Sequence, residues 1–356
     1  MSTPRLTDEK RQVIAKEIAK GGSNREIAAR LGVSIGTVSN VRTGAWAGIR
    51  ITELEKEITL LRAFKDIRAV PMDVPYKKNP TRHEAVPFLL ASDWHIDETV
   101  NAEAMNGLNE YTLSIAQERV KTFFKCAADI IGIYKHNSDV RSLVIAALGD
   151  FASCWLHDEL VETNGLTPPQ AVLQMLDMWT GGIDFLLSQS VVEDILFVGT
   201  VGNHGRITKK PQAKNRAIKN YEWILYSLLA RYYAAKDERR IKFQLPCGYF
   251  NWVSVFDRHI RCHHGDSIKY QGGIGGVHIP LRKAIGQWNK ARRADLDLLG
   301  HWHQCERSKD YVINGSLIGY NEYAEIIKAD PEKAQQCIFL LHQKYGPTGF
   351  YPIVVQ

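Results

Sequence analysis

The stretch VPFLLASDWH, residues 86–95, decides how this chain folds. Its apolar run is short and is bounded by polar residues, which is typical of a strand that is buried on both faces. The run ends in Asp93 and His95, two residue types that bind metal ions. The stretch therefore predicts a buried strand that carries metal ligands at its carboxyl end.

The same pattern occurs four more times along the chain. The other runs are SLVIAALGD (142–150), DILFVGTVGNH (194–204), HIRCHHGD (259–266) and LDLLGHWH (296–303). Longer stretches with helical character separate them, at 111–135, 168–188 and 216–235. Alternating strands and helices predict an α/β fold whose site lies at the strand ends.

The ligand-type residues are far apart in the sequence, so they can meet only in the folded chain. If each of the five strands carries its ligand-type residues at its carboxyl end, these residues come together at one edge of the sheet structure. Glycines stand beside several of them, and glycine lets the backbone turn sharply and lets an ion approach closely. The sequence thus predicts one shared metal site.

In order, the motifs D-x-H, G-D, G-N-H, H-G and G-H-x-H resemble those of the calcineurin-like metallophosphoesterase superfamily. The resemblance covers roughly residues 86–320, and NGSL at 314–317 matches the family's turn after the last motif. It implies a β-sandwich flanked by helices, with four layers in the order α/β/β/α. We expect this domain to span residues 86–356.

The resemblance also implies a role for each motif residue. One metal ion would be held by Asp93, His95 and His303, and the second by Asn203, His264 and His301, with Asp150 bridging both. Carboxylate, amide and imidazole ligands suit transition metals better than Ca²⁺. We expect two divalent ions, Mn²⁺ first, with Fe, Zn²⁺ and Mg²⁺ as alternatives.

Three residues near the ligands need separate interpretation. In the family, the histidine at the position of His204 does not bind metal but assists the leaving group. An acidic residue usually follows that histidine. This chain has Gly205 at the position of the acidic residue, which leaves the orientation of His204 open. The next residue, Arg206, is expected either to contact the substrate phosphate or to be a surface charge. His263 is the alternative to His264 as ligand. His157 resembles the histidine that some nuclease members of the family place downstream of the G-D motif, but we expect it to be a loop residue.

Residues 1–50 predict a small all-α domain of three helices. Ser23 and Glu26 form a capping-box pattern, and Gly32 suits a tight turn. The stretch SNREIAARLGVSIGTVSNVRTG, residues 23–44, resembles the helix-turn-helix of site-specific recombinases and small transcription regulators. The resemblance implies that its last helix faces DNA through Thr37, Ser39, Asn40 and Arg42, with Ile35 and Gly36 beside them. Docking a protein is the alternative role.

Residues 51–85 are expected to connect the two domains. Apolar residues at helical spacing over 51–67 predict an amphipathic helix, which would either form a short homodimer seam or pack on its own domain. The following proline-containing segment indicates an extended linker.

Charge is distributed unevenly along the chain. Residues 1–83 carry 16 Lys and Arg against 9 Asp and Glu, a net of +7, whereas the remaining 29 basic and 30 acidic residues give −1. Such asymmetry suggests contact with nucleic acid, although a solvated helical face is an equal alternative. Two more basic stretches, 206–219 and 282–293 with Trp288, are candidates for a nucleic-acid path, and an ordinary solvated helix face is the alternative for each.

The sequence gives no sign of a membrane span or a secretory signal. Its six cysteines form no CxxC pair, which predicts reduced thiols and a cytoplasmic location. The leading functional hypothesis is a nuclease that its helix-turn-helix directs to DNA. The alternatives are a phosphatase or small-molecule phosphodiesterase with a protein-docking module, and a DNA-binding protein whose metal site is degenerate.

Overall fold

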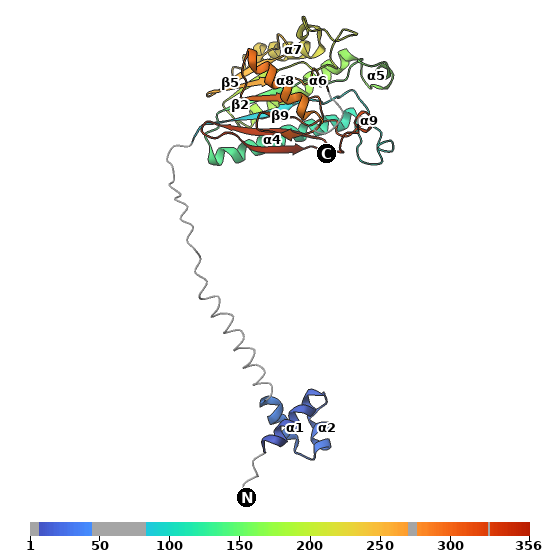
Figure 1. The fold of residues 1–356 in the computed structure, drawn as a ribbon, viewed down its shortest axis with the longest axis vertical. Coiled ribbons are helices and arrows are strands. Elements are labelled where there is room, and N and C mark those ends of the chain that lie inside the picture. Colours follow the sequence, from blue (N-terminus) through green and yellow to red (C-terminus); the bar gives the residue numbers. More distant parts are fainter. Residues whose placement is uncertain (1–6, 45–82, 270–275, 327) are drawn as a thin grey trace. The chain divides into compact units, whose positions relative to one another are not determined.

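The computed structural model describes residues 7–44, 83–269, 276–326 and 328–356. The chain divides into two compact units, Met1–Lys78 and Asn79–Gln356, each with its own core (Figure 1). The amphipathic helix expected at 51–67, most of the expected linker and the glycine-rich stretch at 270–275 lie outside the described residues.

The first unit contains the three short helices that the sequence predicts. They are α1 (Asp8–Ala19), α2 (Asn24–Leu31) and a helical stretch at 35–44. Ser23 and Glu26 form the expected capping box, and Gly32 ends α2 with a left-handed φ of 63°. The buried core is small and consists of Ile14, Ile27, Ala28 and Val38.

The second unit is built on two sheets. The larger has the order β11-β10-β1-β2-β3-β4 and the smaller β5-β6-β7-β9-β8. The larger sheet contains β1 (Ala85–Ala91), β2 (Ser142–Ala147), β3 (Asp194–Gly199), β4 (Ile241–Gln244), β10 (Gln335–His342) and β11 (Gly346–Val354). The smaller contains β5 (Asn251–Val255), β6 (Arg258–Cys262), β7 (Leu296–Leu299), β8 (Glu306–Arg307) and β9 (Tyr311–Ile313).

Side chains of β1 alternate between two cores, as the two-residue period of a strand requires. Val86, Phe88 and Leu90 belong to the core that the two sheets share, together with residues of β5, β6, β7 and β9. Leu89 and Ala91 belong to the core on the helical side of the larger sheet. A one-residue shift of β1 would exchange these two sets.

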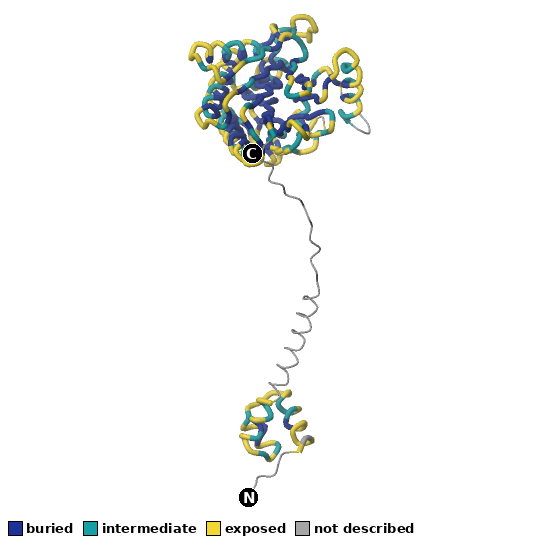
Figure 2. Tube along the Cα trace, turned by 90° about the vertical axis from the view of Figure 1, so that its left-hand side faces the viewer, coloured by how far each residue is buried: buried dark blue, intermediate teal, exposed yellow. Residues whose placement is uncertain are grey.

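Helices cover the outer faces of both sheets. The larger sheet packs on α4 (Leu113–Asn137), α6 (Pro168–Ser188) and α7 (Tyr221–Ala235), and the smaller on α8 (His278–Ala291). Two shorter helices, α5 (Asp158–Thr163) and α9 (Glu322–Ile326), complete the unit. Figure 2 shows the buried residues gathered inside this unit. The predicted four-layer α/β/β/α sandwich is confirmed.

All five predicted strands are present, and the helix expected at 168–188 has those same bounds. The helix expected at 216–235 is wrong in one detail. It is a short 3₁₀ turn, Ala217–Lys219, followed by α7, because Asn220 is extended and caps α7 by accepting a hydrogen bond from the backbone of Glu222. Among the described residues, no helix has both the length and the apolar character that a membrane span needs.

Two adjacent glycines of α6 give a matched test of packing between the helices. A Cβ at Gly182 would lie 2.0 Å from a ring carbon of the buried Phe124, whereas a Cβ at Gly181 would meet nothing within 4 Å. We expect Gly182→Ala to lower the free energy of unfolding by about 1–3 kcal/mol through overpacking. Gly181→Ala should keep or raise it, because alanine is the better helix former. Urea unfolding of both variants checks this, and equal stabilities would contradict it.

Candidate metal centre

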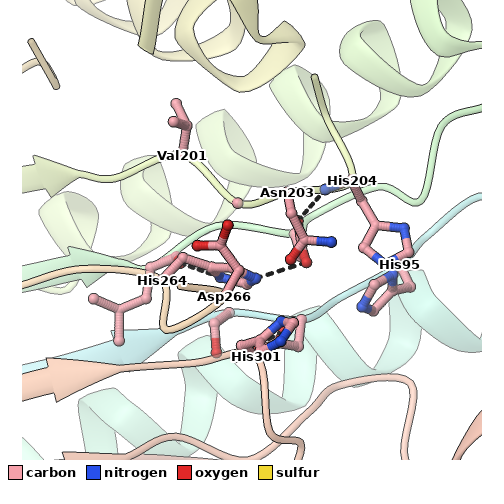
Figure 3. Close-up of polar contacts among 12 residues, drawn as sticks. His95, Val201, Asn203, His204, His264, Asp266 and His301 are labelled. Atoms are coloured by element: carbon pink, nitrogen blue, oxygen red, sulfur yellow. Dashed lines mark hydrogen bonds and ion pairs between the residues drawn. The ribbon is translucent and has the colours of Figure 1, made fainter. Parts of the chain in front are cut away.

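The ends of five strands meet at one edge of the sandwich. Strands β1, β2 and β3 are parallel neighbours in the larger sheet, and β6 and β7 are parallel neighbours in the smaller. The turns that follow these strands carry the ligand-type residues, and Figure 3 shows side chains from four of them pointing towards one another.

The ligand-type side chains form two clusters. Asp93, His95 and His303 make the first, and Asp150, His264 and His301 the second; within each, the potential ligand atoms lie within 4.8 Å of one another. The first cluster is the set that the sequence analysis assigned to one ion. The second contains His264 and His301, which were assigned to the other ion together with Asn203, and Asp150, which was assigned to bridge both ions.

Distances in the first cluster fit a shared cation. The Nε2 atoms of His95 and His303 lie 3.3 Å apart, and Nε2 of His303 lies 3.4 Å from Oδ1 of Asp93. Ligands that bind one transition metal at about 2.1 Å are separated by about 3.0–3.4 Å. The three atoms are therefore spaced like corners of one coordination shell.

Two buried atoms at the second cluster have no hydrogen-bond partner: Oδ1 of Asn203 and Nε2 of His264. Nε2 of His264 lies 2.7 Å from Oδ2 of Asp150 but is not in hydrogen-bonding geometry with it. Unpaired buried polar atoms are costly, and convergence on a cation would satisfy both. The residues present therefore fit a second divalent ion.

Hydrogen bonds to Nδ1 leave Nε2 of two histidines available as a ligand. Nδ1 of His264 lies 2.8 Å from the carbonyl oxygen of Leu148, which can only accept, so Nδ1 carries the proton. Nδ1 of His95 lies 2.5 Å from Oγ of Ser153, which also contacts the Glu98 carboxylate. Burial opposes charge on His95, but Glu98 outweighs it and raises the pKa of His95 to about 9.

The electrostatics of the buried cluster favour a cation. Burial disfavours a charged imidazole at His264, yet the negative Asp150 raises the pKa of His264 to about 10. Burial equally opposes ionisation of Asp150, and the neighbouring histidines hold its pKa well below the usual value. The same negative potential that would retain a proton attracts a metal ion.

Five of the seven expected ligands have a left-handed backbone, with φ between 49° and 73°. They are Asp93, His95, Asp150, His301 and His303. Non-glycine residues rarely adopt this conformation, which costs about 1–3 kcal/mol each and concentrates at functional sites. This conformation aims successive side chains of a short turn at the same centre.

Two glycines are required because the turns after β2 and β3 touch. A Cβ at Gly202 would lie 1.9 Å from Oδ1 of Asp150, and one at Gly149 would lie 2.3 Å from the backbone nitrogen of Gly202. The backbone nitrogen of His204 then donates to Oδ1 of Asp150 at 2.8 Å. The G-D and G-N-H motifs thus form one interlocked unit.

Sequence reasoning missed the buried side chains that hold these turns. The Glu222 carboxylate accepts hydrogen bonds from the backbone nitrogens of Phe151 (2.8 Å) and Gly202 (2.6 Å). Gln336, on β10, accepts a hydrogen bond from the backbone nitrogen of Ser92 at 2.9 Å and donates to its carbonyl oxygen at 3.1 Å. Neither residue lies in a motif, so no local pattern indicated them.

A third missed residue, Asp97, holds the turn beyond β2. Its carboxylate accepts from the backbone nitrogens of Ser153 (2.7 Å) and Cys154 (2.8 Å). Burial raises the pKa of Asp97 to about 6 despite these hydrogen bonds.

The buried Asn314 of the NGSL turn adds a hydrogen bond to Oγ of Ser92 at 2.9 Å.

His204 faces the centre without an acidic partner in the next position. Its Nδ1 lies 3.3 Å from the carbonyl oxygen of Ser153, which orients the ring in place of a carboxylate. Burial lowers the pKa of His204 to about 4. Gly205 is required by packing, because a Cβ there would lie 2.4 Å from Oδ1 of Asn220.

The structure separates the two candidate histidines of the fourth motif. His264 lies in the second cluster, whereas the buried ring of His263 packs 5.1 Å from Trp288 and has Nε2 3.3 Å from Oδ1 of Asp297. Trp288 lies on α8 and is half-buried, with the Arg261 guanidinium 5.1 Å from its ring centroid. Part of Trp288 is therefore used in packing, and its contact with nucleic acid stays a prediction.

Arg206 lies on the other side of Asn203 from the metal clusters. Its guanidinium donates to the carbonyl oxygens of Asn203 (3.0 Å) and Thr208 (3.1 Å). It lines a small separate cavity, so contact with the substrate phosphate stays a prediction. His157 caps α5, as a loop residue would, but it also lines the cleft and its ring centroid lies 6.1 Å from that of His204.

The expected DNA-contacting residues all lie on the helical stretch at 35–44. Asn40 is exposed, whereas Thr37 and Ser39 are half-buried, and the Thr37 hydroxyl shares a hydrogen bond with Ser34. Arg42 donates to the carbonyl oxygen of Gly22 at 2.7 Å, so part of its guanidinium holds the domain together. Their contact with DNA stays a prediction.

Comparison with known proteins supports the first unit's fold. A family model described as a helix-turn-helix domain matches residues 2–41. No curated protein matches the chain. Together with the capping box and three short helices, the match identifies residues 2–41 as a helix-turn-helix.

Several solved structures are similar to the second unit at low scores. Vacuolar protein sorting 29 from Cryptosporidium parvum is 11% identical, covers 76% of this chain and 97% of its own, and has a TM-score of 0.30. A predicted phosphoesterase from Streptococcus pneumoniae TIGR4 is 11% identical, with coverages of 75% and 98% and a TM-score of 0.28. Sulfate thiohydrolase SoxB from Thermus thermophilus is 10% identical, with coverages of 77% and 57% and a TM-score of 0.29.

Metal binding can be tested with two adjacent histidines. We expect the protein to bind two Mn²⁺ ions, and His264→Ala to bind fewer because it removes a ligand of the second cluster. A saturating metal should stabilise the native protein by about 2.7 kcal/mol per site at 100 times Kd. Titration calorimetry and thermal unfolding measure both quantities.

His263→Ala is the matched control. It removes a buried imidazole of the same motif that points away from the centre, so its stability should fall while its metal stoichiometry stays at two. Equal loss of metal in both variants would contradict the assignment of ligands.

The chain thus combines an N-terminal helix-turn-helix with an α/β/β/α sandwich whose motif set resembles that of the calcineurin-like metallophosphoesterases.

Proposed function

We propose that the second unit is a two-metal phosphodiesterase that cleaves DNA, and that the helix-turn-helix binds the duplex. The observation that carries the proposal is the pair of adjoining ligand clusters with two buried atoms that have no hydrogen-bond partner, Oδ1 of Asn203 and Nε2 of His264. A site of this kind suits hydrolysis of a phosphate ester better than any other chemistry that its side chains offer.

Seven side chains would hold the two ions: Asp93, His95, Asp150, Asn203, His264, His301 and His303. Bound as a pair, such ions activate water for attack on phosphorus and neutralise the charge of the phosphate. Mn²⁺ is the metal that we favour for this mixed ligand set.

His204 is the residue that we expect to assist the leaving oxygen. Its ring lies beside the first cluster, with its centroid 4.9 Å from that of His95. Because Nδ1 is directed at the carbonyl oxygen of Ser153, Nε2 is left for the substrate. An anionic phosphate next to the ring favours the protonated imidazole, which can donate to the leaving oxygen.

The size of the cleft favours a second candidate function. The clusters open into a cavity of about 380 Å³ between α5 and α9, which is within the range for a small molecule. Hydrolysis of a small phosphodiester, with the helix-turn-helix docking a protein, is therefore the alternative.

Replacement of His204 tests the chemistry. We expect His204→Gln to lower kcat for phosphodiester hydrolysis by about 10²- to 10⁴-fold, because it removes proton transfer. Its metal stoichiometry should stay at that of the wild type, since His204 belongs to neither ligand cluster. Assays with plasmid DNA and bis(p-nitrophenyl) phosphate, each with and without Mn²⁺, measure the effect, and undiminished turnover would show that His204 has no such role.

Removal of the first unit tests DNA targeting. We expect deletion of residues 1–66 to weaken DNA binding and to flatten its dependence on salt, because basic residues and their phosphate contacts are lost. Activity on bis(p-nitrophenyl) phosphate should persist, since the sandwich cores use residues from Ala85 onwards. If DNA affinity measured by fluorescence anisotropy is unchanged, the helix-turn-helix does not tether DNA.

A further inference from the structure

A strongly basic loop follows closely after His204 and Asn203, of which Asn203 is an expected metal ligand. Residues 206–219, here called the basic loop, contain six Lys and Arg and no Asp or Glu. Its base is closed by pairing between Arg206 and Asn220 and by a 2.8 Å hydrogen bond from Tyr221 to the carbonyl oxygen of Gly205. The loop is thus anchored to the turn that carries the second metal cluster.

The two arginines of the basic loop are engaged within the protein. Arg206 donates to backbone carbonyl oxygens, and Arg216 forms a two-pronged ion pair with Asp266 at 2.8 and 2.9 Å. Arg216 also lies over the ring of Tyr249, 5.0 Å from its centroid. These contacts fix the loop next to the metal centre, so its lysines have a defined position.

Three lysines of the basic loop face solvent without a carboxylate partner. Lys209, Lys210 and Lys214 are exposed, and none forms an ion pair with the residues that the structure describes. Three unpaired positive charges within six residues attract a polyanion more strongly than a single phosphate.

A second region that borders the centre is acidic. Helices α5 and α9, here called the acidic wall, carry five Asp and Glu and no Lys or Arg. Both lie at the same end of the unit (Figure 1). Glu159 and Glu322 line the cleft. Asn203 lines this cleft as well as the small cavity beneath the basic loop, so it stands between the two regions.

The acidic wall also presents apolar side chains to the cleft. Tyr323 is 60% exposed and Ile326 is 77% exposed, and both line the cleft together with Leu160. Exposed aromatic and apolar side chains suit an unstacked nucleobase, which needs no charge complement. The cavity of about 380 Å³ is small enough that it accepts about one nucleoside.

We propose that the basic loop binds the phosphate backbone of the substrate strand, and that the strand ends in the cleft at the acidic wall. A strand that continued past the centre would bring its next phosphates against Glu159 and Glu322, whereas a terminal nucleoside carries no further phosphate. Water attacks the phosphorus of the last phosphodiester, a new P–O bond forms, and the P–O bond to the rest of the strand breaks. The sugar oxygen left on the strand takes up the proton, and one nucleoside monophosphate leaves. This inference rests on the proposed phosphodiesterase function.

The experiment compares a linear single-stranded oligonucleotide with its circular form of the same sequence, using the full-length protein and Mn²⁺. We expect the linear strand to be shortened stepwise from an end and the circular strand to resist. The variant Glu159→Gln/Glu322→Gln should increase cleavage of the circle relative to the linear strand, because it removes repulsion from the acidic wall.

Lysine variants test the loop itself. We expect Lys209→Gln/Lys210→Gln/Lys214→Gln to raise KM for the linear strand about tenfold and to reduce the slope of log affinity against log salt by about 2. Its activity on bis(p-nitrophenyl) phosphate should match that of the wild type. The control Lys242→Gln/Lys309→Gln/Lys344→Gln removes the same charge from exposed positions near the opposite strand ends and should change neither quantity.

The outcomes separate the inference from the function on which it rests. Equal cleavage of circular and linear strands, or equal behaviour of the two lysine variants, overturns the inference. Activity on the small phosphodiester without any activity on oligonucleotides also overturns it, but leaves a phosphodiesterase. If the wild type with Mn²⁺ hydrolyses neither substrate, the proposed function itself is wrong.

Discussion

The Glu222 carboxylate accepts hydrogen bonds from two backbone nitrogens in turns that follow different strands, those of Phe151 and Gly202. Gln336 holds the turn after β1 in the same way, through both backbone groups of Ser92, and Asp97 holds the Ser153 segment. Each ligand-bearing turn of the larger sheet is therefore fixed by a buried polar side chain from outside its motif. These bonds satisfy backbone groups that would otherwise be buried without partners.

This support matters because the turns adopt an unfavourable backbone conformation. Five ligand residues have positive φ, and only a surrounding structure that fixes the turns can maintain that arrangement. Histidines whose Nδ1 atoms are directed at Leu148 and Ser153 have their rings oriented before any ion binds. The metal centre is thus preorganised by the protein, which lowers the cost of ordering ligands when an ion binds.

The sequence predicts the parts of this fold that depend on local pattern. The five strand-plus-ligand runs, α6 and the Ser23 capping box follow from neighbouring residues, and the structure contains them. β10 was not predicted, although it pairs with β1 from Cys337 to His342, because its apolar run belongs to none of the five motifs. Glu222 and Gln336 could not be predicted, because their partners lie 71 and 244 positions away along the chain.

The contact between Gly149 and Gly202 limits how the sequence of such a chain can change in evolution. A side chain at Gly149 would collide with the backbone of the turn after β3, and a side chain at Gly202 would collide with the Asp150 carboxylate, which both turns surround. Neither obstacle is a flexible neighbour that could move aside. A change at one position cannot be rescued by a second change nearby, since no smaller residue exists to make room. Random mutagenesis coupled to selection for a folded centre would therefore recover glycine alone at both places.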